Sequence, residues 1–152
     1  MVINPQKMLL VENDPNDVEL MQLALRDLSY IRTLDILNDG EQAISYLLGS
    51  ETQPPVSQLP RFVLMDLQLP KLTGIEVLRA IRSHPSTQFL PVVMMTSSAE
   101  ERDLGDCYNS GVNSYVVKPL DSQQFQELAR LVGRYWMTMN TPLDILNSFE
   151  NR

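Results

Sequence analysis

The chain has 152 residues, of which 43% are hydrophobic and 20% charged, a composition typical of one soluble globular domain. Its formal net charge of −7 argues against binding to nucleic acid, which requires clustered Lys and Arg, and against binding to anionic membranes. No apolar stretch is long enough to span a bilayer, and the N-terminus lacks the layout of a signal peptide. The single cysteine, Cys107, cannot form an internal disulfide, so we expect a cytoplasmic protein.

Strand and helix patterns alternate along the chain. Short apolar runs predict the strands, and apolar residues at three- and four-residue spacing predict the helices. The first helix is also marked by Asp14, a suitable N-cap, followed by Pro15 at the first helical position. In chain order we expect a strand at 7–11, a helix from 15 to about 28, a strand at 34–37, a helix at 41–48, a strand at 61–65, a helix across 75–81, a strand at 91–95, a helix at 99–108, a strand at 114–117 and a helix from about 121 through 132.

Two segments interrupt this rhythm. Residues 49–60 contain three prolines among polar residues and predict a long surface loop. The stretch after about Met139 is too short for a second domain. We therefore predict one domain at 1–138 and a C-terminal tail at 139–152.

Five strand–helix repeats require crossover connections, hence a parallel sheet covered on both faces by helices. Right-handed crossovers leave few arrangements for five strands. The predicted fold class is therefore α/β, a flavodoxin-like doubly wound five-stranded parallel sheet in the order 2-1-3-4-5.

Ionisable and polar residues follow four of these strands, and the strand ends open onto one crevice in such a sheet. The residues are Glu12, Asn13, Asp66, Thr96 and Lys118. Carboxylate and amide oxygens suit a hard cation such as Mg²⁺, while a lysine and a threonine hydroxyl suit phosphoryl oxygens. This set points to phosphoryl transfer with Asp66 as the nucleophile, because such catalysis consists chiefly of positioning and charge neutralisation.

In its motifs the chain resembles a response-regulator receiver domain of two-component signalling. The resemblance covers about residues 7–136, and the motifs are jointly specific in this order. They are Leu10-Val11-Glu12, Met65-Asp66-Leu67-Gln68-Leu69-Pro70 with Gly74, Met95-Thr96-Ser97, and Tyr115-Val116-Val117-Lys118-Pro119.

The resemblance implies that Asp66 accepts a phosphoryl group from the phosphohistidine of a sensor kinase. It implies Mg²⁺ held by Glu12, by Asp66 and by the backbone carbonyl of Gln68, with Asn13 at the position of a further ligand. It implies no enzyme activity beyond phosphotransfer to the chain itself and autodephosphorylation.

The same resemblance implies a conformational switch formed by Thr96 and Tyr115. The phosphoryl group would draw Thr96 inward, and Tyr115 would occupy the vacated space. The Lys118–Pro119 peptide bond is expected to be cis, a deliberate turn feature.

A narrower likeness concerns the 49–60 loop and the C-terminal segment. Both are similar to those of small single-domain regulators that serve phytochrome-type histidine kinases in cyanobacteria. That group implies a homodimer formed through the fourth helix, fifth strand and fifth helix. Tyr108, Tyr135 and Trp136 are aromatic candidates for this surface, although Trp136 could equally close the core.

Two other functions compete with this interpretation. A metal-dependent phosphatase with an aspartyl nucleophile needs a second acid two residues later, and Gln68 occupies that position. A degenerate receiver that acts as an interaction module without phosphate is the second alternative. Asn13 favours it, because the family usually has an acid there.

The neutral side chain of Asn13 generates a prediction about cation affinity. An amide oxygen still ligates Mg²⁺ but adds no charge, so we expect Asn13→Asp to shift Mg²⁺-dependent phosphorylation to lower Mg²⁺ concentrations. A Mg²⁺ titration of phosphorylation in both proteins measures the two midpoints. Equal midpoints would refute the prediction.

Overall fold

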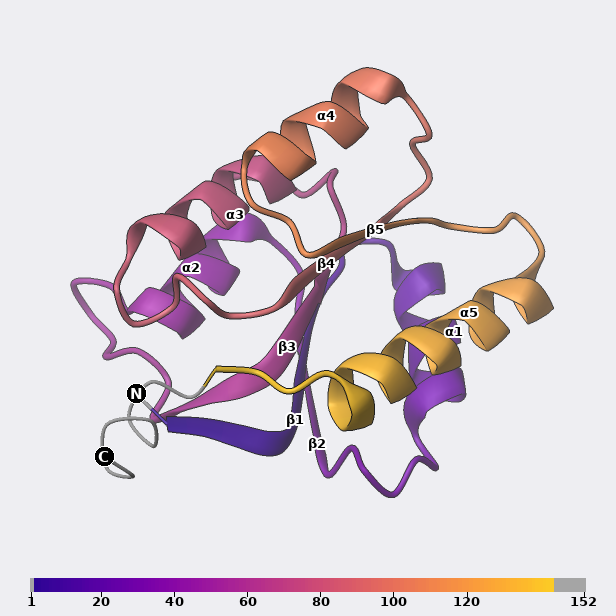
Figure 1. Cartoon of the computed structure of the whole chain (residues 1–152), viewed down its shortest axis with the longest axis horizontal. Coiled ribbons are helices and arrows are strands. Elements are labelled where there is room, and N and C mark those ends of the chain that lie inside the picture. The colour runs from indigo at the N-terminus through magenta and orange to yellow at the C-terminus, as the bar shows by residue number, and fades with distance from the viewer. Residues whose placement is uncertain (1, 144–152) are drawn as a thin grey trace.

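The structure is a computed structural model that describes residues 2–143 (Figure 1). Its strands are β1 (Val2–Val11), β2 (Thr33–Leu37), β3 (Gln58–Met65), β4 (Val92–Thr96) and β5 (Ser114–Val117). Its helices are α1 (Pro15–Leu25), α2 (Gly40–Leu48), α3 (Gly74–Ser83), α4 (Glu101–Asn109) and α5 (Ser122–Arg134), and α5 continues into the π-helical turn η1 (Tyr135–Met139). No helix among the described residues is both long and apolar enough to cross a membrane.

The five strands form one parallel sheet in the order β2-β1-β3-β4-β5. Helices α1 and α5 cover one face, and α2, α3 and α4 cover the other (Figure 1). The predicted doubly wound α/β fold and its strand order are therefore confirmed.

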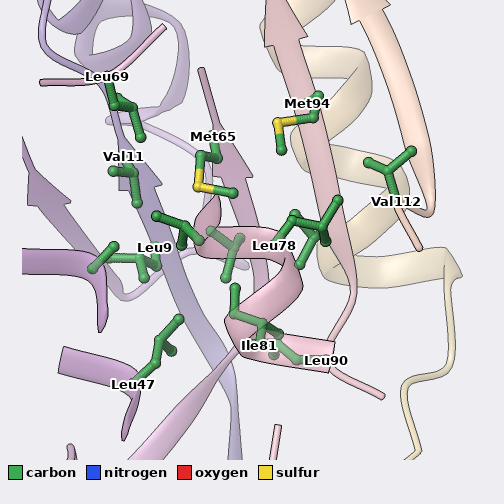
Figure 2. Packing of buried hydrophobic residues seen from close by; sticks show 14 of the residues in the cluster. Leu9, Val11, Leu47, Met65, Leu69, Leu78, Ile81, Leu90, Met94 and Val112 are labelled. Carbon is green, nitrogen blue, oxygen red and sulfur yellow. The ribbon is translucent and has the colours of Figure 1, made fainter. Parts of the chain in front are cut away.

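Successive residues of the central strands pack on opposite faces of the sheet. In β1, Leu9 and Val11 belong to the core beneath α2, α3 and α4, whereas Met8 and Leu10 belong to the core beneath α1 and α5. Figure 2 shows the first of these cores, with side chains from several strands gathered around α3. Both faces are buried at residues 8–11 of β1 and 62–65 of β3, so these parts of the strands are apolar and their carboxyl ends are fixed in place.

The predicted 49–60 loop was wrong at its C-terminal end. Residues 2–4 extend β1 and pair with residues 58–60, so Pro60 lies within β3 opposite Asn4. The ladder shifts register between Asn4 and Met8, which accommodates a proline that has no N–H to donate. A pairing between segments more than 50 residues apart leaves no local signal in the sequence.

The C-terminal segment packs against the sheet as far as it is described. Trp136 lies against the core, with its ring centroid 6.3 Å from that of Phe62, and Arg61 donates a hydrogen bond to the carbonyl oxygen of Asn140 at 2.8 Å. The predicted tail begins at Met139, the last residue of η1. Its residues 144–152 lie outside the described part of the chain.

Gly74 lets the start of α3 approach the backbone that carries Asp66. A Cβ atom at position 74 would lie 2.5 Å from the carbonyl oxygen of Asp66 and 2.9 Å from Cα of Leu67, so the backbone would have to shift.

We expect Gly74→Ala to lower the free energy of unfolding by about 1–3 kcal/mol, measured by urea denaturation. Gly105→Ala in α4 is the control, since its Cβ would meet no atom within 4 Å. In a helix interior alanine is more favourable than glycine by about 0.5–1 kcal/mol, so Gly105→Ala should raise the free energy of unfolding. A loss of the same size in both variants would contradict the packing explanation.

Candidate functional site

Backbone pairing brings Glu12, Asp66 and Lys118 to one edge of the sheet. Val11 is the partner of Met65 across the ladder, so Glu12 and Asp66 leave neighbouring strands at the same level. The amide of Asp66 donates to the carbonyl oxygen of Val11 at 3.0 Å. The backbone amide of Lys118 donates a hydrogen bond to the carbonyl oxygen of Thr96 at 2.7 Å. The strand ends therefore converge as the sequence predicted.

The ammonium group of Lys118 donates hydrogen bonds to three carboxylates. Its Nζ lies 2.6 Å from Oε1 of Glu12, 2.7 Å from Oδ2 of Asp17 and 2.6 Å from Oδ2 of Asp66. An ammonium has three N–H donors, so each donor has one carboxylate partner. The side chain of Lys118 is only 9% exposed, which makes these charge-assisted hydrogen bonds strong ones.

This arrangement shifts the pKa values of Glu12 and Lys118. Burial is the main cause that raises the pKa of Glu12 to about 7, and the hydrogen bond from Lys118 opposes the rise. Burial acts to lower the pKa of Lys118, but hydrogen bonds to Asp17, Asp66 and Glu12 outweigh it and raise that pKa above its ordinary value. Lys118 is thus charged at neutral pH, and a cation beside Glu12 would favour its ionised form.

The three carboxylates line an open pocket of about 340 Å³. Asn13, Gln68 and Ser97 also line it. The amide of Gln68 donates to Oδ1 of Asp66 at 3.1 Å, which fixes the orientation of that carboxylate. The pocket therefore gathers the predicted acidic, amide and cationic groups in one place.

Asp17 is the site residue that sequence reasoning missed. An acid in the first turn of a helix is favoured by the helix dipole alone, but the carboxylate of Asp17 also reaches Lys118. The only local signal was the placement of an acid in the first turn of a helix that follows Glu12 directly. The predicted N-cap Asp14 is confirmed, because its Oδ1 accepts hydrogen bonds from the amides of Asn16 and Asp17.

Thr96 and Tyr115 lie on adjacent strands next to the pocket. Thr96 is buried at the end of β4 and does not line the pocket, whereas Ser97 does. The hydroxyl of Tyr115 donates to the carbonyl oxygen of Ser98 at 2.8 Å, and its ring packs partly against the core. Burial raises the pKa of Tyr115. The two predicted switch residues are thus linked through the backbone of the segment that follows β4.

The expected cis bond between Lys118 and Pro119 is not found. No peptide bond within residues 2–143 is cis. The expectation came from the resemblance alone, and nothing in the local sequence opposes the small intrinsic preference of an X–Pro bond for trans.

The donor set fits a divalent cation. Ligand oxygens from Glu12, Asp17 and Asp66 all lie within 4.8 Å of one another. Hard cations such as Mg²⁺ and Mn²⁺ prefer carboxylate and carbonyl oxygens, which this pocket supplies. The described side chains are therefore suited to hold a divalent metal ion at this edge of the sheet.

Comparison with known proteins gives the same family from sequence and from structure. Residues 8–130 match the family model of the response regulator receiver domain. The probable methanogenesis regulatory protein FilR2 of Methanothrix harundinacea is 35% identical over 137 residues, which are 90% of this chain and 87% of that protein. The response regulator Rcp1 of Synechocystis is 32% identical over 133 residues, which are 88% of this chain and 90% of Rcp1.

Among solved structures, the phosphorylated cyanobacterial phytochrome response regulator RcpA superposes with a TM-score of 0.83 at 31% identity, covering 90% of this chain and 97% of RcpA. The Mn²⁺-bound form of Rcp1 gives a TM-score of 0.82 at 32% identity and covers 91% of this chain and 99% of that structure. Fold and sequence agree, and the chain belongs to the response regulator receiver domain family.

Proposed function

We propose that the receiver domain of this protein, residues 1–138, accepts a phosphoryl group on Asp66 from a sensor histidine kinase. The observation that carries the proposal is the 2.6 Å hydrogen bond between Lys118 and Asp66 inside an open acidic pocket. A cation held beside the acceptor carboxylate is the arrangement that phosphoryl transfer requires.

The chain's own residues divide the work of the transfer. The P–N bond to the kinase histidine breaks as a P–O bond to a carboxylate oxygen of Asp66 forms, and the imidazole leaves. The ammonium of Lys118 turns from Asp66 towards a phosphoryl oxygen and neutralises its charge. Glu12, Asn13, Asp66 and the carbonyl of Gln68 would hold Mg²⁺. When bound, that ion would supply positive charge to the phosphoryl oxygens.

Labelling with a small phosphodonor tests the acceptor. We expect acetyl phosphate with Mg²⁺ to label the wild-type protein and to leave Asp66→Asn unlabelled, because an amide cannot form the acyl phosphate. Phosphate-affinity gels and intact mass spectrometry measure the label. Asp27→Asn is the matched control, since the Asp27 side chain is almost fully exposed and lies away from the pocket.

The outcomes separate the candidate functions. A label that survives Asp66→Asn would contradict the proposed acceptor. A wild-type protein that takes no label from acetyl phosphate or from a histidine kinase would favour the phosphate-independent interaction module.

The proposed partner is a phytochrome-type histidine kinase. The support is the likeness to Rcp1 and RcpA, of which the latter is described as a cyanobacterial phytochrome response regulator. The output signal would pass through Thr96 and Tyr115 to the outer surface. Tyr115 would exchange its bond to Ser98 for a more buried position once Thr96 has moved towards the phosphoryl group.

That outer surface is the proposed homodimer interface on α4, β5 and α5. Large apolar side chains are exposed on all three elements, namely Leu104, Tyr108, Val117 and Leu131. Exposed apolar residues of this kind are typical of interfaces that exclude charge from their centre.

Sedimentation velocity with and without beryllofluoride, a phosphoryl mimic, tests this interface. We expect Leu104→Glu to weaken the dimer, because it buries a charge between two apolar surfaces. Leu23→Glu is the matched control: Leu23 lies on α1 and is 39% exposed, against 37% for Leu104. An effect of the same size in both variants, or in neither, would exclude the proposed interface.

A further inference from the structure

Asp17 has a position that the proposed site does not yet explain. It lies in the first turn of α1, and its Oδ2 accepts a hydrogen bond from Lys118 at 2.7 Å. The Asp17 side chain is 18% exposed, so its charge is partly withdrawn from solvent. A helix N-terminus favours a negative side chain at this position.

The other acidic groups of the pocket are already engaged. Oε2 of Glu12 accepts hydrogen bonds from the amides of Asn13 and Asp14. Oδ1 of Asp66 accepts one from Gln68. By contrast, Oδ1 of Asp17 accepts no hydrogen bond from any residue in the described part of the chain, so this oxygen is free to take another partner.

Asp14 also lines the pocket, but its side chain caps α1 and makes no hydrogen bond to Lys118. Its Oδ1 is bound to the amides of Asn16 and Asp17 as the cap of α1, and moving it would leave those donors unpaired. Asn13 lines the pocket but contributes no charge. Asp17 is therefore the one further acid of the pocket that is directed at Lys118 and not used as a cap.

We propose that Asp17 supplies the negative charge that Asn13 does not, and thereby sets the affinity of the pocket for a divalent cation. The proposal rests on the cation site of the proposed function. A bound cation favours the ionised form of Glu12, and three carboxylates around one ammonium then leave two negative charges, which one divalent cation balances. Without Asp17 only one negative charge would remain.

Asp17 also gives Lys118 a partner when the other two carboxylates turn to the cation. A buried ammonium without a partner is costly, so competition between Lys118 and the cation would weaken cation binding. Retention of the Lys118–Asp17 bond removes part of that cost, because one N–H donor stays paired. Asp17 is in this sense a positioning residue for Lys118 as well as a source of charge.

A double-mutant cycle between positions 13 and 17 tests the proposal. Isothermal titration of Mg²⁺ into wild type, Asp17→Asn, Asn13→Asp and the double variant gives four dissociation constants without any phosphorylation. We expect Asp17→Asn to weaken Mg²⁺ binding at least about 10-fold in the wild-type background, the range found when groups that support a metal site are removed. In the Asn13→Asp background, Asp17→Asn should weaken Mg²⁺ binding by a clearly smaller factor, because the aspartate at position 13 then supplies the negative charge.

Glu19→Gln is the matched control, because Glu19 lies on the same helix but lines a different pocket. It should leave the dissociation constant unchanged, and thermal melting should show all variants folded. The proposal is overturned if Asp17→Asn leaves Mg²⁺ affinity unchanged, if the loss is equal in both backgrounds, or if the wild type binds no Mg²⁺ at millimolar concentrations. A wild type that binds Mg²⁺ but accepts no phosphoryl group would contradict the proposed function and leave the role of Asp17 to be judged by the cycle.

Discussion

One buried ammonium group holds the candidate site together. Lys118 comes from the end of β5, and its three carboxylate partners come from the end of β1, the first turn of α1 and the end of β3. A charged group withdrawn from water is costly unless it is paired, and three carboxylates near one another repel unless a cation lies between them. The ammonium and the carboxylates therefore stabilise each other, and the proposed phosphoryl group or divalent cation would enter by replacing hydrogen bonds that already exist.

The sheet provides the rigid frame that this exchange needs. The strands that carry Glu12 and Asp66 are buried on both faces, so the ends of β1 and β3 cannot shift without disturbing two cores at once. Gly74 adds a second constraint, because α3 begins in direct contact with the backbone of Asp66 and Leu67. The side chains in the pocket can then change partners while the backbone beneath them stays in place.

The same edge of the sheet connects the pocket to the outer surface. The backbone amide of Lys118 donates a hydrogen bond to the carbonyl oxygen of Thr96. Two residues after Thr96, the carbonyl oxygen of Ser98 accepts a hydrogen bond from the hydroxyl of Tyr115. This short path runs from the carboxylate of Asp66, the proposed acceptor, to the elements α4 and β5, where exposed apolar side chains are found. A change of charge at Asp66 thus has a route of direct contacts by which it can alter a docking surface.

Much of this protein is determined by local patterns in the sequence. Apolar runs predicted the five strands, and helical spacing predicted α1, α2, α3 and α5, while α4 was expected as a polar helix and η1 was not predicted. The crossover rule then left the strand order that is observed. The residues at the strand ends could be identified for the same reason, since a parallel sheet brings its carboxyl ends to one edge. The tertiary structure alone decided the pairing of residues 2–4 with 58–60 and the position of Asp17 against Lys118. These features depend on contacts between segments far apart in the chain, and the free energy of such contacts is set by three-dimensional packing and charge, which no local pattern of residues records.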